Sequence, residues 1–334
     1  MIDFLRFHDD IAPRVVAEIL RRVEPVDESN AAHLIEELNR VTLTGEMADF
    51  RDAGARAGYI QKRFASRSSS VAASLLYPDV QPICMTLLGE TQESSLALSV
   101  QTTTMKRGLL SEHPDAASSK TIRMASVGGA AGEAVFAVMV LRDYIVASRG
   151  GPMDCASGGM RIDAIVLDYE AGWQKAAESL LPAWAGARGD GDAVTFGQCD
   201  VLHGIDEPVN AAVRTRAGML DLLVFSYVLV ENAKGLRESL QHDTGQGAWG
   251  GLLPGLLLAA PVGAVFLMLD SSFKLWESTG NGAGERGLIQ EIVHACGVQV
   301  EECRPRWRKE VLRHPRLSNL CNNLLVLVKK GSVQ

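Results

Sequence analysis

The sequence lacks the clusters of cysteine and histidine that metal sites and disulfide frameworks require. Its six cysteines are scattered along 334 residues, and no two of them form a C-x-x-C pair. The seven histidines do not gather beside them. Zinc sites and disulfide frameworks usually show as closely spaced cysteines, so we expect neither a bound metal nor structural disulfides.

Little in the chain would direct it to a membrane or out of the cell. The first ten residues, MIDFLRFHDD, are charged and lack the apolar core of a signal peptide. One long uncharged run, residues 244–269, is interrupted repeatedly by glycine and proline, which a membrane-spanning helix would rarely tolerate. We therefore expect no transmembrane segment and an intracellular protein, cytoplasmic or nuclear.

The chain has no excess of positive charge. Its formal net charge is −7 and its pI about 5.6, which argues against a global electrostatic grip on nucleic acid. One dense basic run, Arg304–Lys309 with Arg313 and Arg316, stands out and contains Trp307. Such a run is usually a solvated helix or hairpin face. The alternative is a local patch that contacts the phosphates of an RNA substrate.

The first third of the chain reads as helical. Apolar residues recur at helical spacing over residues 9–23, from residue 29 onward and over 45–64. A polar break is expected at 66–70, a short apolar helix at 71–77 and a linker at 111–120. We predict a helical N-terminal segment, residues 1–119, that caps the rest of the molecule, with a separate helical domain as the alternative.

From Lys120 the pattern changes to alternating strands and helices, which is typical of a mostly parallel sheet. We predict an α/β domain over residues 120–334 with a doubly wound, Rossmann-like, seven-stranded sheet. The last two strands suit a closing antiparallel pair. The expected strands are 121–127, 162–167, 193–196, 219–225, 264–269, 298–302 and 324–328.

Candidate ligand-binding residues follow four successive strands: the small-residue turn Gly128–Gly132, then Asp168, then Asp200, then Ser226 with Tyr227. Ligands of an open parallel sheet bind beyond the carboxyl ends of its strands. A glycine-rich turn allows close backbone approach, and carboxylates at the next two ends suit ribose hydroxyls and an adenine amino group. Each residue alone also has a structural explanation: Asp168 as a helix cap, Asp200 as a solvated turn residue and Tyr227 as part of the core.

All four features in this order resemble the class I S-adenosylmethionine-dependent methyltransferases, over roughly residues 120–330. The resemblance implies S-adenosyl-L-methionine as the cofactor. The matching positions are Gly128-x-Ala130-x-Gly132 for the glycine loop, Asp168 for the ribose-binding acid, Asp200 for the acid after the third strand, 221–229 for the fourth-strand segment and 261–267 for the turn into the fifth strand. The implied cofactor-binding residues are Ser126, Gly128, Gly129, Ala130, Gly132, Asp168, Tyr169, Asp200, Val201 and Ser226.

Two positions depart from that family. Ser126 stands two residues before the first glycine, where the family usually has an acid that contacts the methionine amino group. The loop before the second strand is also long, so Asp168 lies further from the glycines than the usual spacing of about 20 residues. These departures leave room for a member of the fold that binds no ligand.

Two further stretches, Gly58–Phe64 and the pattern Leu167-Asp168-Tyr169-x-x-x-Trp173, resemble a eukaryotic subgroup. That subgroup includes fungal enzymes that methylate N3 of a uridine in large-subunit ribosomal RNA. The resemblance implies a role in ribosomal RNA processing. It also suggests that Tyr59, Lys62 and Arg63 contact the substrate.

Three functions remain open. A methyltransferase needs alignment of donor and acceptor rather than a strong nucleophile, and Tyr227 and Glu231 are then the candidate catalytic residues. Glu231 could instead be a surface helix residue. A nicotinamide-dependent dehydrogenase is disfavoured because Gly128–Glu133 breaks G-x-G-x-x-G at its third and sixth places. A non-catalytic binding or scaffold protein is the third. The methyl acceptor can be RNA, protein or a small molecule.

Overall fold

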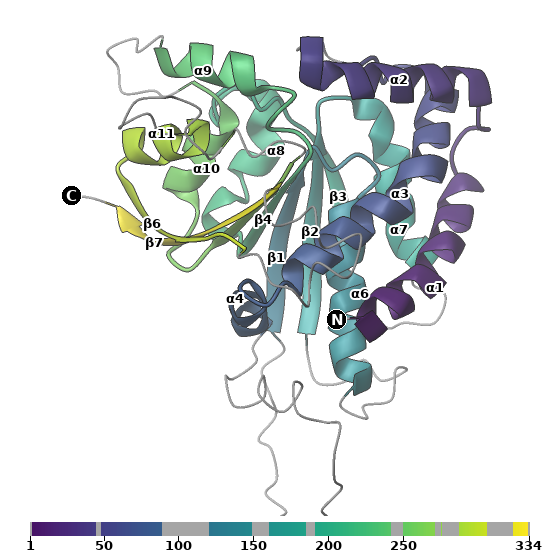
Figure 1. Ribbon diagram of the computed structural model, residues 1–334, viewed down its shortest axis with the longest axis horizontal. Coiled ribbons are helices and arrows are strands. Elements are labelled where there is room, and N and C mark those ends of the chain that lie inside the picture. Colours follow the sequence, from purple (N-terminus) through teal and green to yellow (C-terminus); the bar gives the residue numbers. More distant parts are fainter. Residues whose placement is uncertain are drawn as a thin grey trace, which may run out of the picture.

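A seven-stranded sheet forms the centre of the molecule (Figure 1). The computed structural model describes residues 2–44, 48–88, 120–148, 160–184, 191–241, 250–270, 275, 287–305 and 323–332. The strand order is β3-β2-β1-β4-β5-β7-β6. The strands are β1 (Lys120–Val127), β2 (Met160–Asp168), β3 (Ala193–Gln198), β4 (Leu222–Ser226), β5 (Val265–Leu269), β6 (Val298–Cys303) and β7 (Leu324–Ser332).

The directions of the strands confirm the predicted doubly wound, mostly parallel sheet. Neighbouring strands from β3 through β2, β1 and β4 to β5 run parallel, and β7 runs antiparallel to both β5 and β6. The chain moves outward from β1 to β2 and β3, then returns to place β4 on the other side of β1. This reversal of strand order lies between β1 and β4, and it marks the place where such sheets bind ligands.

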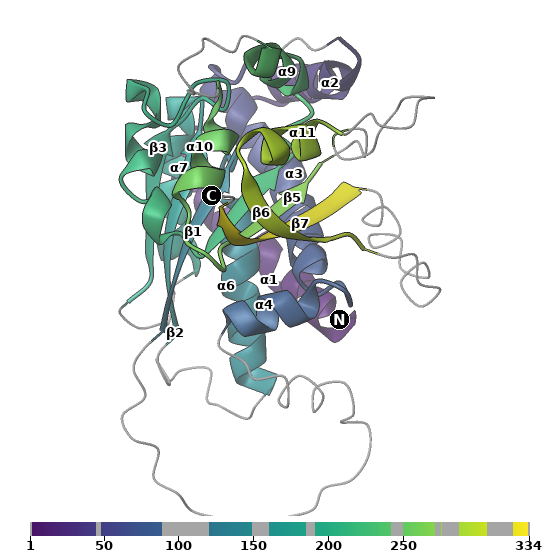
Figure 2. The same ribbon diagram turned by 90° about the vertical axis from the view of Figure 1, so that its left-hand side faces the viewer.

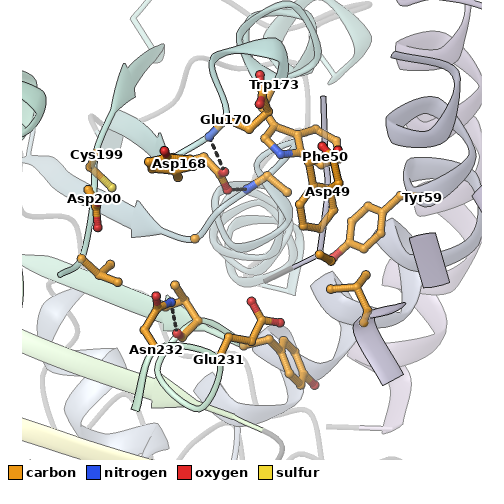
Figure 3. Close-up of a pocket in the computed structure, with 18 of the residues that line it drawn as sticks. Asp49, Phe50, Tyr59, Asp168, Glu170, Trp173, Cys199, Asp200, Glu231 and Asn232 are labelled. Carbon is orange, nitrogen blue, oxygen red and sulfur yellow. Dashed lines mark hydrogen bonds between the residues drawn. The ribbon is translucent and has the colours of Figure 1, made fainter. Parts of the chain in front are cut away.

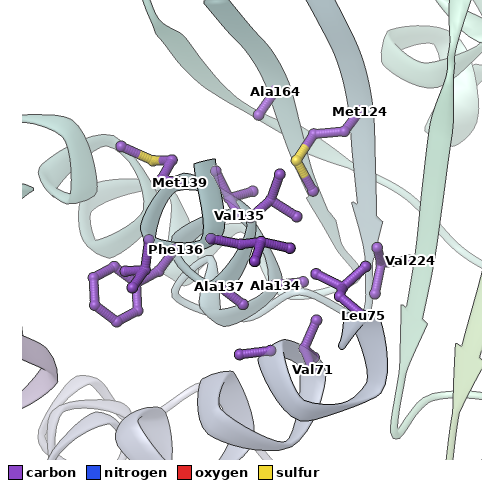
Figure 4. Packing of buried hydrophobic residues seen from close by; sticks show 14 of the residues in the cluster. Val71, Leu75, Met124, Ala134, Val135, Phe136, Ala137, Met139, Ala164 and Val224 are labelled. Atoms are coloured by element: carbon purple, nitrogen blue, oxygen red, sulfur yellow. The ribbon is translucent and has the colours of Figure 1, made fainter. Parts of the chain in front are cut away.

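Helices cover both faces of the sheet, which explains why its central strands are almost continuously apolar. The face in Figure 4 meets α6 (Glu133–Ser148) and α7 (Gln174–Trp184), the latter after the short 3₁₀ turn η1 (Ala171–Trp173). The opposite face meets α8 (Ala211–Arg214), α9 (Ala233–Gln241), α10 (Leu252–Ala259) and α11 (Leu288–Ala295), with the 3₁₀ turns η2 (Pro208–Asn210) and η3 (Ala217–Met219). Consecutive residues of β1 point to opposite faces, so Met124 belongs to the apolar cluster on the first face and Ala125 to the cluster on the other.

The N-terminal helices are α1 (Ile2–Leu20), α2 (Glu28–Thr44), α3 (Ala53–Leu75) and α4 (Gln81–Leu87). They pack on the same side of the sheet as α6 and α7 (Figure 1). Val71 and Leu75 at the end of α3 lie beside Val224 of β4 and the small residues of α6 (Figure 4). Both ribbon views place α2 and α9 at the end of the molecule where the parallel strands finish (Figure 2).

The predicted polar break at residues 66–70 is wrong, because α3 continues through it to Leu75. The serines stay helical by hydrogen bonding back to the preceding turn: the hydroxyl of Ser70 donates to the Ser66 carbonyl at 3.0 Å and that of Ser74 to the Ser70 carbonyl at 2.8 Å. Ser68 and Ser69 are fully buried. The Ser68 hydroxyl also lies 3.0 Å from Nε2 of His8 in α1.

Several boundaries differ from those predicted. Helix α3 begins at Ala53 rather than near residue 45, because Asp52 caps it by accepting a 2.6 Å hydrogen bond from the N–H of Ala55. Met219 lies in η3, so β4 begins three residues later than expected. The predicted linker at 111–119, the loop at 149–159 and most of the basic run, 306–322, lie outside the described residues. Among the helices that are described, none is long and apolar enough to cross a membrane.

Candidate ligand site at the carboxyl ends of the strands

A cavity of about 510 Å³ opens at the reversal of strand order (Figure 3). Residues that follow β1, β2, β3 and β4 line it, as do residues of the N-terminal segment. The volume lies within the range of small-molecule sites, about 300–1,000 Å³. The lining comprises Leu38, Ala48–Arg51, Tyr59, Arg67, Gly128, Ala130, Asp168–Glu170, Trp173, Cys199–Leu202, Tyr227, Val228, Glu231 and Asn232.

The turn after β1 follows a path that ordinary residues would resist. Gly128 has φ +66°, and a Cβ there would lie 2.5 Å from Cβ of Val228. Ala130 has φ +40°, in the left-handed region that costs an L residue about 1 kcal/mol or more. The N–H of Gly129 donates to the Leu167 carbonyl of β2 at 3.1 Å. The turn is therefore tied to the neighbouring strand and brings its backbone to the edge of the cavity.

Asp168 ends β2 and holds the same turn. Its Oδ2 accepts a hydrogen bond from the N–H of Ala130 at 3.0 Å, and its Oδ1 accepts one from the N–H of Glu170 at 3.2 Å (Figure 3). Burial raises the pKa of this carboxyl to about 6, against the lowering effect of those two N–H groups. A carboxylate offers about four acceptor positions, so two remain for a ligand in the cavity.

Asp200 sits in a loop that is fixed from within. Its Oδ1 accepts from the N–H of Leu202 at 2.9 Å, and its Oδ2 lies 2.8 Å from Nδ1 of His203. The buried Asn210 accepts from the N–H of Asp200 and donates to the Asp200, His203 and Gly204 carbonyls. The loop thus presents Asp200 and Val201 to the cavity in one arrangement.

The segment after β4 is held just as firmly. Tyr227 has φ +60°, and its N–H donates to the Leu269 carbonyl at 2.8 Å. The buried Asp270 accepts from the N–H groups of Leu229 and Val230 at 2.9 and 3.0 Å. Backbone strain of this kind at a cavity lining is common at functional sites. These contacts place Tyr227 and Glu231 in the cavity wall.

Two acids, Glu133 and Glu231, lie within electrostatic reach of one cation at the cavity, Arg67. Burial raises the pKa of Glu133 and of Glu231 to about 7, and the positive charge of Arg67 opposes both shifts. Arg67 itself is disfavoured as a cation by burial, but Tyr59, Glu133 and Glu231 raise its pKa overall. The guanidinium lies 4.5 Å from the ring centroid of Tyr227 and 5.2 Å from that of Tyr59.

An aromatic wall closes the side of the cavity formed by the N-terminal segment. The ring centroids of Phe50, Tyr59 and Trp173 lie 5.5–5.7 Å from one another (Figure 3). Trp173 is only 1% exposed, so most of its indole ring packs against other residues of the protein. Arg56 donates to the carbonyls of Phe50 and Arg51 and so fixes the segment that carries Phe50.

The structure brings most of the predicted site residues together. The predicted residues that line the cavity are Tyr59, Gly128, Ala130, Asp168, Tyr169, Asp200, Val201, Tyr227 and Glu231. The predicted residues outside the lining are Lys62, Arg63, Ser126, Gly129, Gly132 and Ser226.

The residues outside the lining have identifiable surroundings. Lys62 forms an ion pair with Glu28 at 3.1 Å on the helix surface. A Cβ at Gly132 would meet Leu180 and Val166, so a side chain at that position would point into the core rather than into the cavity. Ser126 is fully buried, and its hydroxyl has no hydrogen-bond partner among the described residues.

Sequence reasoning missed Arg67, Phe50, Glu133 and Glu170. Arg67 lies eight residues after Tyr59, slightly more than two helical turns, so both face the same side of α3 if the helix is continuous. The predicted break at 66–70 hid that relationship. Phe50 falls inside the helix predicted for residues 45–64, but α3 begins only at Ala53, and no local signal placed Phe50 at the site.

No protein-family model and no curated protein sequence matches the chain. Similar solved structures include a SAM-dependent methyltransferase from Aquifex aeolicus, with 12% identity over 62% of this chain and 81% of that chain and a TM-score of 0.32. A SAM-dependent methyltransferase from Methanosarcina mazei shares 11% identity over 63% and 93%, with a TM-score of 0.30. A putative class I S-adenosylmethionine-dependent methyltransferase from Listeria monocytogenes shares 9% over 100% and 90%, with a TM-score of 0.39.

These similarities are too low to carry an argument about activity. The fold assignment rests on the strand order and directions described above. Within the described part of the chain, no group of three or more His, Cys, Asp or Glu residues is arranged to hold a metal ion.

Proposed function

We propose that the protein is an S-adenosylmethionine-dependent methyltransferase. The observation that carries this proposal is the cavity at the reversal of strand order, which gathers the glycine turn, Asp168, Asp200 and Tyr227 from four successive strand ends. When bound, the cofactor supplies a methyl group on a positively charged sulfur. The protein then has to align donor and acceptor and to exclude water.

The residues present fit that cofactor. Asp168 keeps two acceptor positions for the ribose hydroxyls after holding Ala130 and Glu170. Asp200 and Val201 border the place for the adenine, and Tyr169, 59% exposed, offers an aromatic face at the mouth of the cavity. The backbone of the turn at Gly128 and Ala130 borders the sulfur end.

Tyr227 and Glu231 are our candidates for the acceptor side. Both line the cavity beyond β4, and the pKa of Glu231 near 7 lets its carboxyl gain or lose a proton at neutral pH. A weakly acidic nitrogen would need such a group. A Tyr227→Phe variant that methylates its acceptor at the wild-type rate would exclude a role for the hydroxyl.

Among acceptors we propose RNA, with a base of ribosomal RNA as the specific case. The basic run from Arg304, with Trp307 inside it, and the resemblance of Gly58–Phe64 to the uridine-N3 subgroup support this choice. Mass mapping of ribosomal RNA modifications after deletion of the gene tests it. A complete set of modifications in the deletion strain would exclude ribosomal RNA.

We also propose that residues 1–119 act as a cap on the domain formed by 120–334. Leu38, Phe50, Tyr59 and Arg67 contribute one wall of the cavity, which supports this division of labour. In this arrangement the N-terminal segment shapes the space in which the acceptor meets the donor.

Isothermal titration with S-adenosylhomocysteine and with NAD tests the proposal. We expect S-adenosylhomocysteine to bind and NAD not to bind. Binding of NAD alone would favour a dehydrogenase. Binding of neither would favour the non-catalytic scaffold, for which Ser126 in place of the usual acid is the supporting observation.

A further inference from the structure

The guanidinium of Arg67 lines the cavity beside Tyr227, the residue that follows β4. It meets the rings of Tyr59 and Tyr227, but no described residue forms a hydrogen bond or an ion pair with it. A guanidinium carries five N–H donors, and contacts with ring faces satisfy none of them. Because Arg67 lines the cavity, these donors are available to a bound ligand.

The guanidinium of Arg67 limits which chemical group of a ligand can bind to it. A planar guanidinium matches a carboxylate or a phosphate through two parallel hydrogen bonds. Glu133 and Glu231 lie within electrostatic reach of Arg67, so a doubly charged phosphate would be repelled by two neighbouring acids. A group that carries an ammonium beside its carboxylate suits both signs of charge. An α-amino acid is such a group.

The strand order gives the direction of the ligand. If Asp200 after β3 borders the adenine and Asp168 of β2 binds the ribose, the same molecule continues past β1 toward β4. Arg67 and Tyr227 stand at that end. This step rests on the proposed function, because S-adenosylmethionine has its amino-acid group opposite its adenine.

We propose that Arg67 binds the α-carboxylate of the donor's amino-acid end, against the rings of Tyr59 and Tyr227. The assignment also offers a substitute for the acid that the family usually has at the position of Ser126. The usual acid beside the methionine amino group is missing there, and the Ser126 hydroxyl is buried away from the cavity lining. Recognition of the amino-acid end therefore depends on helix α3 rather than on the end of β1.

Two ligands and three variants of the full-length protein test the proposal by isothermal titration. S-adenosylhomocysteine carries the amino-acid end, whereas 5′-methylthioadenosine keeps the adenosine and the sulfur without it. We expect Arg67→Met to lower the affinity for S-adenosylhomocysteine about 10- to 100-fold and to leave the affinity for 5′-methylthioadenosine unchanged. Arg67→Lys keeps the positive charge but loses the two parallel N–H donors. Its affinity for S-adenosylhomocysteine should lie between those of the wild-type protein and Arg67→Met. Arg14→Met, on the exposed face of α1, is the matched control and should change neither ligand.

The outcomes separate this inference from the proposed function. Equal affinity of the wild-type protein for both ligands would overturn the role of Arg67 and leave the methyltransferase proposal standing. The same would follow if Arg67→Met weakened both ligands equally or neither. Failure of both ligands to bind the wild-type protein would overturn the proposed function and this inference with it. If Arg67→Met does not fold, Arg67→Lys carries the test, and unchanged affinity of that variant for both ligands would overturn the role of Arg67.

Discussion

The backbone N–H of Ala130 donates a 3.0 Å hydrogen bond to Oδ2 of Asp168, joining the turn after β1 to the last residue of β2. Ala130 holds φ +40°, so this bond stabilises a backbone conformation that residues with a Cβ seldom adopt. The same carboxylate is our candidate for binding ribose. Asp168 thus links the shape of the turn to the recognition of the ligand.

Substitution of Asp168 separates these two tasks. Asp168→Asn keeps one acceptor oxygen, for the N–H of Ala130, but loses the charge and puts an NH2 group opposite the N–H of Glu170. We therefore expect S-adenosylhomocysteine to bind about 10- to 100-fold more weakly, with a smaller loss of stability than in Asp168→Ala. Asp168→Ala leaves two N–H groups without their acceptor and should also lower the free energy of unfolding by about 1–3 kcal/mol. Titration and urea denaturation check both effects. Unchanged affinity in folded Asp168→Asn would remove the ribose contact.

Gly128 and Gly263 form a matched pair for testing the turn. Both have positive φ, +66° and +90°, so alanine at either position costs about 1 kcal/mol in backbone strain. A Cβ at Gly128 would also lie 2.5 Å from Cβ of Val228, whereas a Cβ at Gly263 meets nothing within 4 Å. We expect Gly128→Ala to be more destabilising than Gly263→Ala by about 1–3 kcal/mol in urea denaturation. Adding Val228→Ala should recover part of that difference, and equal costs would contradict the observed contact.

The buried carboxyl of Glu133 makes stability depend on pH. Burial raises its pKa from 4.5 to about 7 in the folded protein, so its favourable contribution is complete below pH 4.5 and is lost as pH rises through 7. One oxygen of Glu133 has no hydrogen-bond partner among the described residues, so a glutamine there loses no hydrogen bond at that oxygen. We expect Glu133→Gln to stabilise the protein at pH 8, relative to its effect at pH 4.5, by about 1–3 kcal/mol. Denaturant titrations at the two pH values measure this difference, and an identical effect at both would show that Glu133 is not titrating in this window.

Leu75 tests whether the N-terminal helices and the sheet unfold together. Leu75 is 2% exposed and packs with Val224 of β4, so Leu75→Ala should cost about 2–5 kcal/mol. If residues 1–119 form a cap, a single unfolding transition should shift as a whole, by tryptophan fluorescence and by circular dichroism alike. Two separate transitions, of which the substitution moves only one, would instead indicate an independent helical domain.

The local pattern of the sequence was enough for the sheet and for part of the site. Apolar runs such as Leu222–Phe225 belong to strands buried on both faces, and such strands alternate along the chain with helices of clear period. Because the carboxyl ends of parallel strands meet at one edge, naming the residues after each strand also placed Asp168, Asp200 and Tyr227 together. No knowledge of distant contacts was needed for this step.

Tertiary packing decided the rest. The four serines of residues 66–70 have weak helix propensity, and the burial of Ser68 and Ser69, with Ser68 3.0 Å from His8 of α1, keeps this stretch helical. That continuity turns Arg67 toward the cavity, where it meets Tyr59 from its own helix and Tyr227 from the end of β4. Gly132, a predicted ligand contact, lies outside the cavity lining, and a Cβ there would point toward Leu180 and Val166. A sequence motif specifies the backbone path over a few residues, whereas the direction of each side chain depends on which distant surface packs against it.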